Sequence, residues 1–84
     1  MEERTLEYPV LDIKKTGERI RKLRTERGMS VEEVSCFMGF NSIQAVYKWQ
    51  GGKGLPTVDN LYALSRLFGV PIEDILVEKE QETL

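Results

Sequence analysis

The sequence predicts an all-α fold, a compact domain of five short helices preceded by an extended N-terminal segment. Three observations predict it. Apolar residues recur three and four positions apart along most of the chain, which is the spacing of one helix face. Glycine, serine and threonine stand where these apolar runs start and stop, as helix caps do. No stretch alternates apolar and polar residues clearly enough to predict a sheet.

The first helix is expected over residues 16–27. Ile20 and Leu23 form its apolar stripe, Ile13 extends the same stripe toward the N-terminus, and Arg27 continues it. Gly28 should end the helix, because glycine adopts a positive φ at the lowest cost.

The second helix is expected to begin after Ser30, which forms a capping box with Glu33 three residues later. Val34 and Met38 lie on its core side, and Gly39 ends it.

The third helix is expected within residues 42–50, with Asn41 or Ser42 as its cap. Val46 and Trp49 are three positions apart, so we expect both in the core. A glycine-rich loop, residues 51–54, follows it.

Two further helices complete the prediction. Thr57 caps the fourth, which Gly69 ends, and Pro71 lies in the first turn of a short fifth. The residues expected inward on these two helices are Val58, Leu61, Leu64, Phe68, Ile72, Ile75 and Leu76.

The ends of the chain differ from its centre. Residues 6–11 are apolar but interrupted by Pro9, which predicts an extended segment that packs along the domain or reaches a second subunit. Phe37 falls on the outward side of the second helix, and we expect this segment to cover it. The chain thus divides into an extended segment 1–13, a helical domain 14–77 and an acidic, frayed tail 78–84.

The net charge of −2 is unevenly distributed. Residues 14–72 carry ten basic and five acidic side chains, a net +5, whereas residues 1–13 carry −3 and residues 73–84 carry −4. A basic centre permits contact with phosphates, but a solvated helix face gives the same count.

Composition argues against several other functions. With 84 residues the chain has no room for a separate catalytic domain, and it contains no histidine to pair with Cys36, so we expect no catalytic residues, no metal and no cofactor. No apolar run is long enough to span a membrane and no signal peptide is visible, which predicts a cytoplasmic protein without a membrane partner. No small-molecule ligand is evident.

The ordered set of motifs resembles the Cro/phage-repressor (XRE-type) helix-turn-helix family over residues 16–76. The resemblance rests on GERIRKLR (17–24), GMSVEEV (28–34), MGF (38–40), VYKWQGGK (46–53), LPT (55–57), LFGV (67–70) and DIL (74–76). It implies a lambda-repressor-like DNA-binding domain that regulates transcription, in the manner of a repressor, by inserting residues 42–50 into the major groove of a double-stranded DNA operator.

The resemblance also implies which residues contact DNA. Ser35 stands at the helix crossing, where the family usually has alanine, and Gly39 supplies the sharp turn. The side chains expected to contact bases are Ile43, Gln44, Tyr47 and Lys48. Those expected to contact phosphates are Ser42, Gly52, Lys53 and Arg19, with bare backbone N–H groups in residues 51–54.

Three positions depart from the family pattern. Val31 replaces a glutamine that commonly grips phosphate, and Gln50 replaces a glutamate, so contact with Arg24 would be a hydrogen bond without a full ion pair. Gly39 and Trp49 are one residue further apart than usual, which we place at residues 40–41.

Two alternatives stay open. Arg19, Arg21 and Lys22 fit a solvated helix face as well as a contact surface. The same fold also serves as a protein-interaction module, such as an antitoxin or adaptor, and an apolar outer face on the third helix would favour that function.

We expect a homodimer, because one such domain offers a single recognition helix and operators have two half-sites about 34 Å apart. Its interface would involve Leu67, Val70, Ile75 and Val77, or residues 6–11.

Overall fold

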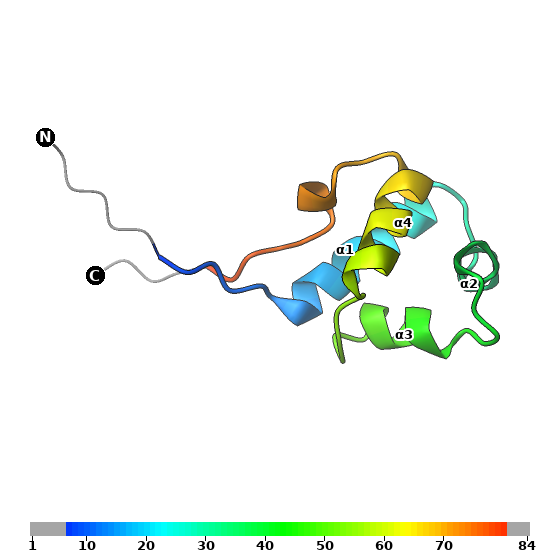
Figure 1. Cartoon of the computed structure of the whole chain (residues 1–84), viewed down its shortest axis with the longest axis horizontal. Helices are drawn as coiled ribbons and strands as arrows, with labels where there is room; N and C mark the ends of the chain where they lie inside the picture. Colours follow the sequence, from blue (N-terminus) through cyan, green and yellow to red (C-terminus); the bar gives the residue numbers. More distant parts are fainter. Residues whose placement is uncertain (1–6, 81–84) are drawn as a thin grey trace, which may run out of the picture.

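The computed structural model describes residues 7–80, and four α-helices surround the core there. They are α1 (Ile13–Glu26), α2 (Val31–Met38), α3 (Gln44–Gln50) and α4 (Val58–Phe68), followed by a 3₁₀ turn, η1 (Ile72–Asp74) (Figure 1). The all-α prediction is confirmed. The fifth α-helix is not, because Pro71 precedes only this single short turn.

Helix α1 begins three residues earlier than expected. The carboxylate of Asp12 accepts a hydrogen bond from the Lys15 backbone N–H at 2.9 Å, which is the function of an N-cap. Ile13 therefore lies in the first turn and is exposed, contrary to the expected apolar stripe. Gly28 follows the helix with a φ of +66°, as predicted.

The predicted boundaries of α2 are confirmed. The Ser30 side chain accepts from the Glu33 N–H at 3.0 Å, and the Glu33 carboxylate accepts from the Ser30 N–H at 2.8 Å, which completes the capping box. Gly39 ends the helix with a φ of +77°. Ser35 is buried, as expected of a small residue where two helices cross.

Helix α4 confirms one part of its expected core and contradicts another. Leu61, Leu64 and Phe68 are buried, but Val58 is 81% exposed. At about 100° per residue, Val58 points about 120° away from Leu64, so it lies at the edge of the stripe in the first turn. The Thr57 hydroxyl donates to the carboxylate of Asp59 instead of capping the helix, and this bond lowers the pKa of Asp59.

The buried core joins the inner faces of all four helices. Its members are Ile20, Leu23, Val31, Val34, Val46, Trp49, Leu61, Leu64, Phe68 and Ile75.

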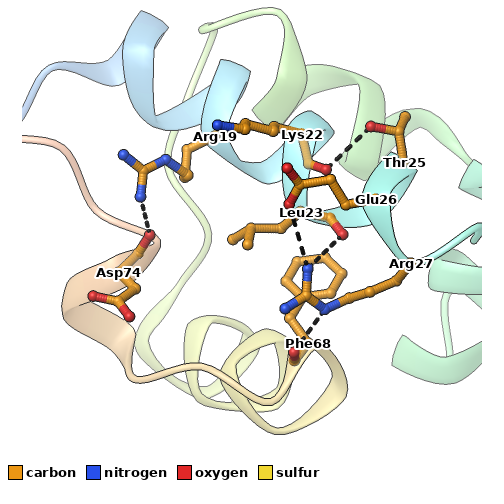
Figure 2. A network of polar contacts seen from close by, with 8 residues as sticks. All are labelled: Arg19, Lys22, Leu23, Thr25, Glu26, Arg27, Phe68 and Asp74. Carbon is orange, nitrogen blue, oxygen red and sulfur yellow. Dashed lines mark hydrogen bonds and ion pairs between the residues drawn. The ribbon is translucent and has the colours of Figure 1, made fainter.

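Arg27 fastens the end of α1 to α4. Its guanidinium donates to the carbonyls of Phe68, at 2.7 Å, and Leu23, at 3.0 Å, and lies over the Phe68 ring (Figure 2). This explains why a charged residue continues the apolar stripe of α1, since its head group satisfies the final carbonyl of α4.

The two ends of the described chain form a short antiparallel pair, called here the terminal ribbon (residues 10–12 and 77–79). The Asp12 N–H donates to the Val77 carbonyl at 2.7 Å, and the Lys79 N–H donates to the Val10 carbonyl at 2.8 Å. The extended segment was predicted, although residue 6 lies outside the described residues. The segment that pairs with it was not predicted, because residues 78 and 79 were expected to belong to a frayed tail.

The expected contact between the N-terminal segment and Phe37 is wrong. Phe37 is 53% exposed, and Figure 1 shows the terminal ribbon leaving the helices at the end of the molecule away from α2. Pairing with the residues that follow η1 holds the segment there instead.

Candidate nucleic-acid interface

Helix α3 has one face in the core and one in solvent. Val46 is fully buried and Trp49 is 5% exposed, as predicted. The Phe40 ring packs edge-on against the Trp49 indole, with 5.8 Å between the ring centroids. Gln44, Tyr47 and Lys48 are exposed on the other side, and these three form what we call the reading face. Core burial of one side of α3 therefore fixes which side chains point outward.

Two further residues predicted to contact DNA, Ile43 and Ser42, lie just before the start of α3. The helix begins at Gln44, and Ile43 is half-buried against the core, which leaves only part of its side chain available to a ligand. Ser42 is exposed, and its hydroxyl accepts weakly from the Gln44 N–H at 3.4 Å. This hydroxyl therefore lies at the N-terminus of α3.

Close contact with α1 fixes the position of α3. A side chain at Gly17 would collide with the backbone carbonyl oxygens of Trp49 and Gln50, so glycine is required there. The Arg24 Nε donates to the Gln50 Oε1 at 2.8 Å, while its Nη1 donates to the Met29 carbonyl at 2.7 Å. The predicted Arg24–Gln50 hydrogen bond is confirmed, and it ties the C-terminus of α3 to α1.

Three of the four backbone N–H groups in the glycine-rich loop, residues 51–54, are bonded within the protein and are not bare as expected. The N–H groups of Gly51, Gly52 and Lys53 donate to carbonyls of α3, at 2.9, 3.1 and 3.0 Å. Gly52, with a φ of +72°, packs against Lys14 at the start of α1, where a Cβ would approach the Lys14 Cα. The loop therefore continues α3 as a tight turn, and Lys53 is its exposed basic side chain.

The basic side chains of α1 divide between two sides of the molecule. Arg19 donates to the Asp74 carbonyl at 2.7 Å, so it lies beside η1 (Figure 2). Arg21 instead lines a cleft of about 400 Å³ with Arg24, Tyr47 and Gln50.

Sequence reasoning named Arg19 as a phosphate contact, whereas the structure places Arg21 beside α3. The missed signal was that Arg21 is one turn beyond Gly17 and three residues before Arg24, both of which touch α3.

Within residues 7–80, no group of three histidine, cysteine or acidic side chains could hold a metal ion. No helix in this part of the chain is long and apolar enough to cross a membrane.

A helix-turn-helix family model matches residues 20–75. This range includes the second half of α1 and the whole of α2, α3 and α4. The chain belongs to this helix-turn-helix family. The family assignment agrees with the resemblance found in the sequence motifs.

The relatives include regulators of transcription. The chain is 33% identical over 68 residues to the HTH-type transcriptional activator BcrR of Enterococcus faecalis, covering 81% of this chain and 33% of BcrR. The chain therefore spans about a third of the length of this relative.

Two solved structures share the fold over most of their own length. The restriction-modification controller protein C.AhdI of Aeromonas hydrophila superposes with a TM-score of 0.69 at 25% identity, over 76% of this chain and 96% of that one. The DNA-binding domain of S. venezulae BldD superposes with a TM-score of 0.65 at 27% identity, over 77% and 96%.

Proposed function

We propose that this domain binds double-stranded DNA sequence-specifically, with α3 in the major groove, and acts as a cytoplasmic regulator of transcription. The observation that carries the proposal is the division of α3 between its buried face, Val46 and Trp49, and its exposed reading face. The exposed side chains are polar or amphipathic, which favours DNA over the apolar partner that an adaptor or antitoxin would bind. The regulators among its relatives support the same function.

The residues of the reading face have distinct expected roles. The Gln44 amide, in the first turn of α3, suits the N6 and N7 atoms of adenine, where it both accepts and donates. Lys48 suits a guanine or a phosphate, and Tyr47 a phosphate or a thymine methyl group. Ile43 contributes at most an apolar contact, because it is half-buried.

Phosphate contacts are proposed for Ser42, Lys53 and Arg21. Ser42 and Lys53 lie at the two ends of α3, and Arg21 lies beside Tyr47 on the same side of the molecule. Gly52 serves by shaping the turn that carries Lys53, since its N–H is already bonded. Arg19 is left out because its guanidinium lies against η1.

We further propose that two copies bind two half-sites about 34 Å apart. Ile75 is fully buried, so it belongs to the core and does not form the interface suggested by its apolar character. Leu67, Val70 and Val77 are half-buried and remain the candidate interface residues.

Selection of bound genomic fragments by the purified protein tests this function. We expect enrichment of a repeated half-site sequence at low salt. Gln44→Ala should then reduce discrimination at one base pair by about 1–3 kcal/mol while leaving the other positions of the site unchanged. Failure to enrich any sequence would favour the interaction module instead.

A salt titration tests the phosphate contacts separately. Lys53→Ala should weaken binding to all sequences and lower the slope of log affinity against log salt by about one. Lys79→Ala removes the same charge from the terminal ribbon, away from α3, and serves as the matched control. Equal slopes for the two variants would contradict the proposed docking.

A further inference from the structure

A cleft of about 380 Å³ lies where the terminal ribbon meets η1. It is lined by Tyr8, Pro9, Leu11, Glu73, Leu76 and Glu78. None of these residues belongs to α3 or to the loop that follows it, so the cleft is separate from the proposed DNA surface.

The pairing of the two ribbon segments explains which side chains face the cleft. Leu11 lies opposite Glu78, so these two side chains and those two positions away, Pro9 and Leu76, project from the same face of the ribbon. Lys79, the one basic side chain of residues 73–80, projects from the other face. The cleft therefore has an apolar floor and carboxylates at its rim.

The residues at the rim add an aromatic ring. Tyr8 is 86% exposed, and it lines the cleft together with the carboxylates of Glu73 and Glu78. Aromatic faces and carboxylates both attract a guanidinium, which is planar, weakly hydrated and able to donate to carboxylates in pairs. An apolar floor suits the aliphatic stem of the same side chain.

We infer that this cleft binds an arginine side chain presented by an extended segment of a partner protein. The charge of the surroundings selects this occupant, because residues 73–80 hold four acidic side chains against one basic side chain. Like charge opposes a second copy of the same ribbon, and it opposes the phosphates of DNA. The ribbon projects beyond the helices, so a partner reaches it without passing α3 (Figure 1).

The test uses the full chain and two five-residue peptides, acetyl-Ser-Val-Arg-Val-Ser-amide and the same peptide with citrulline in place of arginine. Citrulline keeps the length and planarity of the arginine side chain but has no charge. In ¹H–¹⁵N NMR titrations, the arginine peptide should give saturable shifts at residues 8, 11, 73, 76 and 78. The citrulline peptide should bind about two- to thirtyfold more weakly, because it loses two exposed charge pairs, with Glu73 and Glu78.

Variants show whether the carboxylates are responsible. The double substitution Glu73→Gln and Glu78→Gln should weaken binding of the arginine peptide by the same factor, about two- to thirtyfold. Glu18→Gln with Glu32→Gln removes the same charge from α1 and α2, outside the cleft, and should leave the affinity unchanged.

Three outcomes would overturn the inference. They are equal affinity for the two peptides, shifts centred on another surface, and cleft signals that move with protein concentration alone, which would show that a second copy occupies it.

Discussion

The helical body, Ile13 to Phe68, and the terminal ribbon are held together by different kinds of contact. In the body, the backbones of α1 and α3 approach each other closely at Gly17, and nine buried apolar residues pack between the helices, together with Ile75 after η1. Two backbone hydrogen bonds hold the ribbon together, and it bonds to the body through one buried hydroxyl, that of Thr16. The body therefore depends on packing, whereas the position of the ribbon depends on a few polar contacts.

Gly17→Ala should have the largest effect. In an exposed helix this change stabilises by up to about 1 kcal/mol, but here the new methyl group would meet two backbone carbonyl oxygens. We expect a net loss of about 2–3 kcal/mol in the free energy of unfolding, measured by urea denaturation. The loss should extend to DNA binding, because α3 would have to move.

Gly54→Ala is the matched control, because its new methyl group meets only the flexible end of the Lys48 side chain. It should cost much less than Gly17→Ala. Equal stability of the two variants would show that the helices separate more easily than their packing indicates.

Thr16→Val tests the attachment of the ribbon and should have an intermediate effect. The Thr16 hydroxyl, fully buried, accepts the Val77 N–H at 3.0 Å, and valine has nearly the same shape but no acceptor. Leaving this N–H without its partner should cost about 1–2 kcal/mol. Hydrogen exchange of the Lys79 amide should accelerate, since that amide closes the ribbon.

Thr16→Ser retains the acceptor and should keep the Lys79 amide protected. If valine and serine variants exchange alike, the hydroxyl does not hold the ribbon in place.

The same difference explains what the sequence could predict. Helix ends depend on local signals, such as the Ser30–Glu33 capping box and Gly39, and these were predicted correctly. The burial of Trp49 followed from spacing within one helix. The ribbon joins residues 65 positions or more apart, with one residue pair in register, and no local sequence pattern predicts such pairing.

The candidate interface divides in the same way. The reading face follows from the periodicity of α3 alone, so it was predicted with its side chains on the correct side. The choice between Arg19 and Arg21 depends on how α1 crosses α3 and where η1 lies, both of which are tertiary properties. The N–H groups of residues 51–53 were misjudged because the loop closes back on α3.

Gln50→Glu should have the smallest effect on stability, and it separates stability from DNA binding. A carboxylate at this position would accept from the Arg24 Nε with an added charge, so we expect a gain of about 0.5–1 kcal/mol. The same charge would lie in the cleft with Arg21 and Tyr47, at the side of the proposed DNA surface, and should weaken DNA binding. Gln44→Glu, on the exposed face of α3, adds the same charge without the Arg24 partner and should also weaken binding. A loss of stability in Gln50→Glu would contradict the geometry of the Arg24 contact, and unchanged DNA affinity in both variants would contradict the placement of α3 against DNA.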